Sequence, residues 1–136
     1  MLYTGHHKGG RHALAAVLAG IVALAAPAAN AAELVMFTSP GCPWCAAWER
    51  EVGDAYAKTD LGQVAPLRRV NLHRDDTAGL DLDRVVRVTP TFVLARDGRE
   101  LGRIAGYPGE SHFWTRLEQL IAQLKKQPPQ NAKAEP

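Results

Sequence analysis

Residues 37–45 read Phe-Thr-Ser-Pro-Gly-Cys-Pro-Trp-Cys and hold both cysteines of the 136-residue chain. The apolar run at 33–38 ends in a Ser-Pro-Gly turn, a pattern typical of a buried strand followed by a change of direction. Apolar side chains then recur at helical spacing from Pro43 to about Lys58. This region therefore predicts a strand, a turn and a helix, with a Cys-x-x-C pair where the helix begins.

Further along the chain, the pattern alternates between strands and helices. More strands are expected at residues 66–72, 91–95 and 100–105. Asp97-Gly98 predicts a tight hairpin between the last two of these strands. A short helix is expected over 80–86 and a longer one over 110–126. This order predicts an α/β fold, a mixed four-stranded sheet with helices on both faces.

The first residues have the pattern of a secretory signal peptide. Lys8 and Arg11 precede an unbroken run of small apolar residues at 13–26, and Ala29-Asn30-Ala31 supplies small residues for cleavage. The apolar run is shorter than the roughly 20 residues that a spanning helix needs. We expect cleavage near Ala31, and the alternative is a retained membrane anchor.

This interpretation divides the chain into three parts. Residues 1–31 are expected to be a cleaved signal peptide, residues 32–126 one domain, and residues 127–136 a polar, proline-rich, disordered tail. The net charge of +2 comes from Lys8 and Arg11, so the remaining chain is neutral. Charge therefore gives no reason to expect nucleic acid as a partner.

The Cys-x-x-C pair predicts a specific chemistry. Proline is favoured at the first position of a helix, which makes Pro43 that residue and Cys42 the N-cap. The Cys42 sulfur could then accept hydrogen bonds from the N–H groups of Trp44 and Cys45. These donors and the helix dipole favour the thiolate, which lowers the pKa of Cys42 and makes it a nucleophile.

Cys45 lies three residues further on, within disulfide reach of Cys42. The predicted cycle is attack by Cys42 on a client disulfide, followed by resolution of the mixed disulfide by Cys45. The reverse direction would oxidise a dithiol. Cys42 and Cys45 are thus the expected catalytic residues, and no cofactor is needed.

Three other uses of the cysteines were weighed. A structural disulfide that closes so small a ring would constrain little chain. A zinc site would need about two more ligands, and there is no second Cys-x-x-C. A soft-metal shuttle, with His73 or His112 as a further ligand, stays open as an alternative.

On these motifs the chain resembles the thioredoxin superfamily. The resemblance rests on residues 37–45 and on Val88-Thr89-Pro90-Thr91 before a strand, and it covers nearly all of residues 32–126. It implies a thioredoxin-like fold and a thiol-disulfide oxidoreductase. In this family the proline that matches Pro90 is cis and packs beside the cysteines. The alternative for Pro90 is a simple turn before the strand.

The resemblance also suggests residues that bind the client. The residue before the family's cis-proline pairs with the client backbone, and Thr89 holds that position. Gly106 matches a glycine that lets the client backbone approach. Trp44, between the two cysteines, is expected to contact clients as well.

Two positions depart from thioredoxin. Met36 stands where thioredoxins carry a buried acid, six residues before the first cysteine. Pro43-Trp44 is nearer to the glutaredoxin and disulfide-oxidase pattern than to the Gly-Pro of thioredoxin. A disulfide-forming oxidase therefore remains a second candidate function.

The chain has a closer resemblance to the periplasmic thioredoxin-like proteins of bacterial sulfur-oxidation clusters (SoxS-type). The matching stretches are residues 33–36, 40–42, 65–69, 89–94 and 106–110. This resemblance implies a periplasmic protein that keeps a sulfur-oxidation carrier-protein cysteine reduced, and we expect it to be a monomer. Its partners would be client proteins with cysteines or disulfides, and a membrane thiol-electron donor that recharges it.

Overall fold

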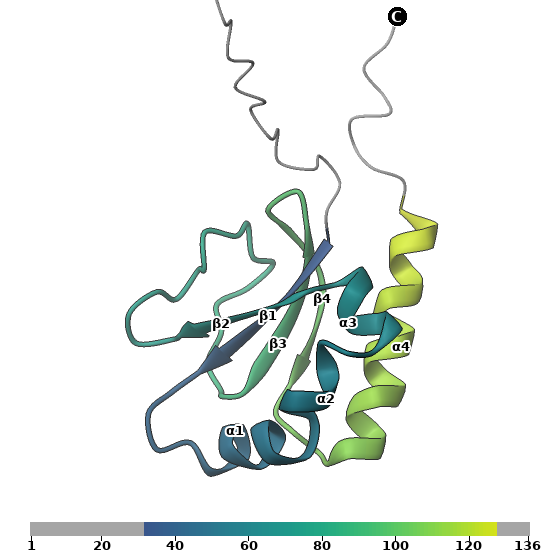
Figure 1. Ribbon diagram of the computed structural model, residues 1–136. Helices are drawn as coiled ribbons and strands as arrows, with labels where there is room; N and C mark the ends of the chain where they lie inside the picture. Colours follow the sequence, from purple (N-terminus) through teal and green to yellow (C-terminus); the bar gives the residue numbers. More distant parts are fainter. Residues whose placement is uncertain (1–31, 128–136) are drawn as a thin grey trace, which may run out of the picture.

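A mixed four-stranded sheet forms the centre of the computed structural model, which describes residues 32–127 (Figure 1). The strands are β1 (Ala32–Thr38), β2 (Leu67–Asn71), β3 (Thr91–Arg96) and β4 (Arg99–Ala105). Their order in the sheet is β2-β1-β3-β4. β1 pairs with β2 in parallel, whereas the β1–β3 and β3–β4 pairs are antiparallel. The expected signal peptide and all but the first residue of the expected tail lie outside the described residues.

Two helices begin where the sequence predicts, at Pro43 and Glu110, but the first of them is interrupted. They are α1 (Pro43–Trp48), the π-helical η1 (Glu49–Gly53), α2 (Asp54–Tyr56), α3 (Asp60–Val64) and α4 (Glu110–Lys126). The helix expected from Pro43 to about Lys58 thus contains a π-helical segment in its middle. α3 was not predicted. Its start is capped by the Thr59 hydroxyl, which accepts a hydrogen bond from Gly62 N at 3.0 Å.

The helices cover one face of the sheet (Figure 1). Successive side chains of a strand point to opposite faces. Leu34 and Met36 of β1 therefore face the helices and pack in a core that includes Trp48 and Phe113. Val35 and Phe37 of β1 face the other way, into a second apolar cluster with Val93 of β3.

That second cluster is covered by an irregular segment, so the helix expected over 80–86 is wrong. Residues 72–90 form turns, bends and one bridge, although Leu80 and Val86 do pack against the sheet. The backbone of Asp81 donates to Gly98 O at 2.8 Å and accepts from Glu100 N at 3.0 Å. These bonds to the hairpin turn and to β4 hold Asp81 in a bridge beside the edge strand, which a helix at this position could not form. The expectation of helices on both faces is therefore also wrong, because the described helices pack on one face only.

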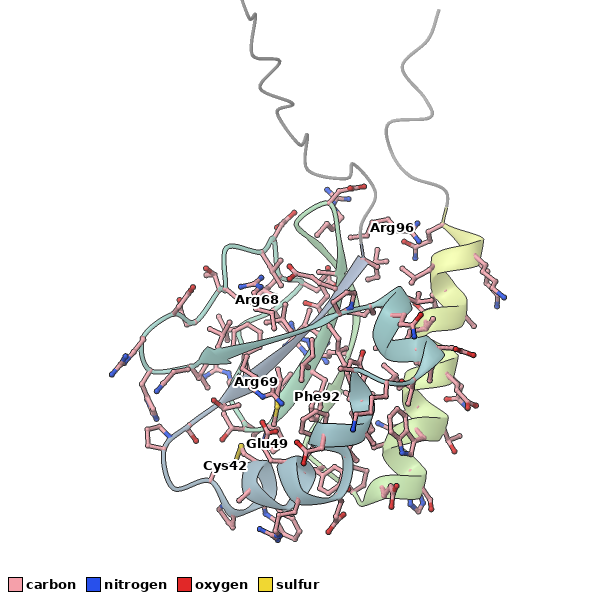
Figure 2. The ribbon with its side chains drawn as sticks, in the orientation of Figure 1. Cys42, Glu49, Arg68, Arg69, Phe92 and Arg96 are labelled. Carbon is pink, nitrogen blue, oxygen red and sulfur yellow. A yellow bond between two sulfur atoms is a disulfide. The ribbon has the colours of Figure 1, made fainter. Side chains whose placement is uncertain are left out.

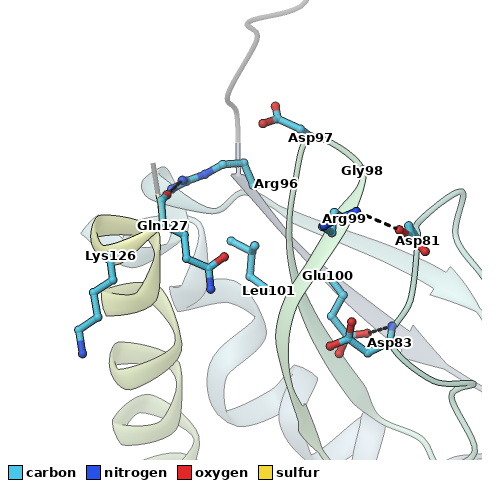
Figure 3. Close-up of a pocket in the computed structure, with 10 residues that line it drawn as sticks. All are labelled: Asp81, Asp83, Arg96, Asp97, Gly98, Arg99, Glu100, Leu101, Lys126 and Gln127. Atoms are coloured by element: carbon cyan, nitrogen blue, oxygen red, sulfur yellow. Dashed lines mark hydrogen bonds and ion pairs between the residues drawn. The ribbon is translucent and has the colours of Figure 1, made fainter. Parts of the chain in front are cut away.

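A buried ion pair fixes the irregular segment to the sheet. Glu100 accepts two hydrogen bonds from the guanidinium of Arg103 and one from Asp83 N, and Arg103 also donates to Arg84 O at 2.7 Å. Figure 3 shows the bond between Glu100 and Asp83. Burial alone would raise the pKa of Glu100, but these hydrogen bonds outweigh it and lower that pKa. The same pairing raises the pKa of Arg103.

The hairpin between β3 and β4 is the one that the sequence predicts. Asp97 and Gly98 both have positive φ angles, 54° and 75°. Two consecutive residues of this kind make the tight turn that matches the twist of paired strands. Arg96 and Arg99 pair across it.

Gly62 provides the first testable prediction. It is buried, and a Cβ atom at this position would lie 2.0 Å from the carbonyl oxygen of Tyr56. Backbone cannot move aside as a flexible side chain can, so Gly62→Ala should lower the free energy of unfolding by about 2 kcal/mol. Urea denaturation would measure the loss, with the exposed neighbour Gln63→Ala as the control. Equal stability of the two variants would contradict the close approach.

Candidate active site

Cys42 and Cys45 form a disulfide at the start of α1, with their Cα atoms 5.3 Å apart. Cys42 is the N-cap, in the extended conformation, and Pro43 is the first helical residue, as predicted. Cys45 N donates to the Cys42 sulfur at 3.1 Å. Of the two expected donors, only this one bonds the sulfur among the described residues; the N–H of Trp44 does not. The N-cap geometry that favours a Cys42 thiolate is therefore present.

The two sulfurs differ in accessibility. Cys45 is 7% exposed and packs in the core beside Trp48, whereas Cys42 is only partly buried. Figure 2 shows Cys42 at the start of α1, at the end of the sheet opposite Arg96. An incoming sulfur atom can therefore reach Cys42 more readily than Cys45.

The segment before β3 lies against Cys42. The Thr89–Pro90 peptide bond is cis, and Thr89 O lies 3.4 Å from the Cys42 sulfur. The Thr89 hydroxyl is hydrogen-bonded to the hydroxyl of Ser39 at 2.7 Å. Sequence reasoning missed Ser39, because its partner is 50 residues away and no local pattern indicates the contact.

Gly106 lies against this segment through a backbone hydrogen bond to Pro90. Its N–H donates to Pro90 O at 2.7 Å, and its φ angle is 82°. A Cβ atom there would meet nothing within 4 Å, so the space beside the backbone is open. The next residue, Tyr107, donates its hydroxyl proton to Glu51 at 2.5 Å. Burial, followed by the contact with Glu51, raises the pKa of Tyr107, so its hydroxyl stays protonated and keeps the loop tied to η1.

Trp44 points into solvent. It is 61% exposed and is one of the few large apolar side chains exposed in the described part of the chain. The structure thus places Trp44, Thr89, Pro90 and Gly106 in the segments around the disulfide.

Met36 is completely buried beneath the helices. It holds the position at which thioredoxins have an acid. Arg69 of β2 is paired with Met36 in the strand register and forms two hydrogen bonds with Glu49, at 2.6 and 2.8 Å (Figure 2). Its guanidinium also lies over the Trp48 ring. The Glu49 carboxylate also lies close to Gly53: a Cβ atom at position 53 would be 2.5 Å from Glu49 Oε2. Among the described residues, no acid hydrogen-bonds to a cysteine sulfur.

Other sites were sought in the described residues. His73 and His112 are exposed, and within residues 32–127 no group of three or more His, Cys, Asp or Glu side chains is placed to hold a metal ion. In the same range, none of the helices has the length and hydropathy to cross a membrane. A pocket of about 750 Å³ lies at the β3–β4 hairpin, at the opposite end of the sheet from Cys42 (Figures 2 and 3).

Comparisons with known proteins agree with this geometry. Residues 23–121 match the family described as thioredoxin-like domain. The reduced form of the periplasmic thioredoxin SoxS from Paracoccus pantotrophus is 46% identical, with a TM-score of 0.65. The match covers 68% of this chain and 97% of SoxS.

A second solved structure shows the fold alone. The oxidised mitochondrial thioredoxin 3 from Saccharomyces cerevisiae is 17% identical, with a TM-score of 0.50 over 66% of this chain and 79% of that one. No curated protein sequence gives a significant match.

Proposed function

This chain belongs to the thioredoxin-like family and is a thiol-disulfide oxidoreductase, and on that premise we propose that it is a periplasmic reductant of client proteins. One observation carries the mechanism. The accessible Cys42 sulfur sits at the N-cap of α1, hydrogen-bonded by Cys45 N, with the cis Thr89–Pro90 segment beside it. The 46% identity to a periplasmic thioredoxin supports the compartment.

The reduced protein donates two electrons in two exchange steps. The Cys42 thiolate attacks one sulfur of a client disulfide, forms a mixed disulfide and releases the other sulfur as a thiolate. The Cys45 thiolate then attacks the Cys42 sulfur, forms the Cys42–Cys45 disulfide and releases the second client thiolate. The client gains two electrons, and the protein ends in the oxidised form seen here.

The residues around Cys42 would hold the client during these steps. Thr89, next to the cis Pro90, would pair its backbone with the client, and Gly106 leaves open space for the client chain. The exposed ring of Trp44 offers an apolar surface beside Cys42. Ser39 holds Thr89 in place through its hydroxyl.

The resemblance to SoxS suggests the kind of client. It would be a protein cysteine that becomes blocked as a disulfide or mixed disulfide, such as that of a sulfur-oxidation carrier protein. Since the periplasm is kept oxidising, a particular cysteine stays free only if a dedicated donor reduces it. The donor itself must be recharged, for which we propose a membrane thiol-electron carrier.

The test of direction is the redox state of Cys42 and Cys45 in living cells. We expect a mainly reduced pair, with a midpoint potential well below the roughly −120 mV of a strong periplasmic oxidant. Thiol trapping of cell extracts and equilibration against glutathione would measure both quantities. A mainly oxidised pair that passes its disulfide to reduced, unfolded proteins would instead establish a disulfide-forming oxidase.

Export has its own test. We propose that residues 1–31 are removed and that the exported form begins at Ala32, where β1 also begins. Mass spectrometry of the periplasmic fraction should find an N-terminus at Ala32 or within a residue or two of it. A full-length form that stays in the cytoplasm would overturn the proposed compartment but not the chemistry.

A further inference from the structure

An apolar and basic groove lies beside the redox centre. It has a volume of about 280 Å³ and is lined by Val85, Val88, Thr91 and three arginines. Val85 and Val88 are 59% and 52% exposed. Exposed valines that gather at a groove indicate a contact surface more strongly than scattered ones do. We call this surface the Val85–Val88 groove.

The groove is continuous with the residues that face Cys42. Val88 directly precedes Thr89, whose carbonyl oxygen lies 3.4 Å from the Cys42 sulfur. Thr91, which also lines the groove, pairs with Ala105 of β4, and Ala105 directly precedes Gly106. A chain bound at Thr89 and Gly106 would therefore run into the groove.

The groove is positively charged, and two of its three arginines form no ion pair among the described residues. Residues 84–91 contain two arginines, Arg84 and Arg87, and no acidic residue. Both arginines are exposed, and neither guanidinium has a hydrogen bond or ion pair within residues 32–127. The third arginine, Arg103, is already neutralised by Glu100. The groove thus presents two exposed positive charges that form no ion pair, beside apolar side chains. Arg84 follows the exposed Asp83 in the chain and interacts electrostatically with Glu100, so Arg87 is the freer of the two.

We propose that the Val85–Val88 groove binds an acidic, extended segment of the client, next to the client cysteine that reacts with Cys42. This inference rests on the proposed function and specifies the client chemistry. Arg84 is five residues from Thr89, and five extended residues span about 17 Å. The aspartate or glutamate residues of the client should therefore lie within about five residues of its cysteine. Opposite charges of this kind mainly accelerate association.

The test uses three synthetic peptides that differ only in charge. Each carries one cysteine as a mixed disulfide with 2-mercaptoethanol, and Glu, Gln or Lys at the third to fifth positions from that cysteine. The measured quantity is the second-order rate constant for reaction with the reduced protein. At low ionic strength we expect the Glu peptide to react about 5- to 10-fold faster than the Gln peptide, and the advantage to shrink with added salt.

Matched variants locate the effect. Arg84→Gln with Arg87→Gln should remove the preference for the Glu peptide, leaving the Gln peptide rate and the midpoint potential unchanged. The control is Lys58→Gln with Arg116→Gln, which removes the same charge from two exposed residues elsewhere on the surface. Arg84→Lys with Arg87→Lys should retain most of the preference.

A preference that survives in the Arg84 and Arg87 double variant, or one that the control variant loses equally, would overturn the proposal. Reaction with bis(2-hydroxyethyl) disulfide, a small neutral probe, reports the dithiol chemistry separately. A protein that fails with this probe contradicts the proposed function. A protein that reduces it but shows no preference among the peptides contradicts only the docking surface.

Discussion

Cys45→Ser is expected to halt turnover and to accumulate clients covalently bound through Cys42. Cys42 keeps its N-cap position and its hydrogen bond from the backbone N–H of residue 45, so it still attacks a disulfide. Without the Cys45 sulfur, no internal thiolate can resolve the mixed disulfide. Turnover should fall below about 1% of the parent rate. Non-reducing electrophoresis and mass spectrometry of periplasmic extracts would detect the trapped species.

The control is Cys42→Ser in the same background. This variant keeps a cysteine, but the remaining sulfur is buried and lies one turn inside the helix, so it should trap far less client. Trapping by Cys42→Ser that equals or exceeds that of Cys45→Ser would reverse the assigned roles. Loss of copper or zinc binding in both variants, with no trapping in either, would favour the metal-shuttle alternative.

Glu100→Gln is expected to lower the free energy of unfolding by about 3 kcal/mol, because it leaves the buried Arg103 charge without its counter-charge. Only 2% of the Glu100 side chain and 7% of the Arg103 side chain are exposed, so water cannot replace the lost partner. Urea denaturation of the oxidised form at neutral pH would measure the change. As a control, Asp81→Asn removes the partner of the well-exposed Arg99, 3.8 Å away, and should change stability little.

The effect of Glu100 should depend on pH in one direction. Its pKa is lowered in the folded state, so the stabilisation is complete above the pKa of the unfolded chain, about 4.3. As the pH falls below that value and through the lower folded pKa, the unfolded state binds the proton first and the stabilisation is lost. The difference between the parent and Glu100→Gln should therefore narrow in acid. A difference that stays constant from neutral pH to pH 3 would show that the carboxylate charge is not what stabilises the segment.

Most of the fold could be predicted because its signals are local. The alternation of apolar and polar residues in 66–72, the run of β-branched and aromatic residues in 91–95, and the positive φ angles that Asp97-Gly98 favours are properties of adjacent residues. The helix expected over 80–86 is wrong because tertiary contacts override a weak local pattern. There, the backbone of Asp81 is held by β4, which is remote in sequence. α3 has one local signal, Thr59 as its N-cap, and its five residues are too few for an apolar period to indicate a helix.

The candidate site, too, could be predicted only where its signals are local. The N-cap position of Cys42 follows from the proline beside it, and the cis bond at Pro90 agrees with the family resemblance. The contacts that hold the site together are not local. Ser39 with Thr89, and Tyr107 with Glu51, join residues more than 45 positions apart, and no periodicity records such pairs.

The irregular segment over residues 72–90 also bears on how this protein can evolve. In a helix, a substitution on the exposed face changes propensity, capping and pairing along the whole element. Here Leu80 and Val86 face the sheet, whereas Arg84 and Val85 face solvent without regular secondary structure to maintain. Mutations at the exposed positions can therefore accumulate one at a time with little loss of folding. Lineages that diverge in their clients should differ most at these positions while the buried ones stay apolar.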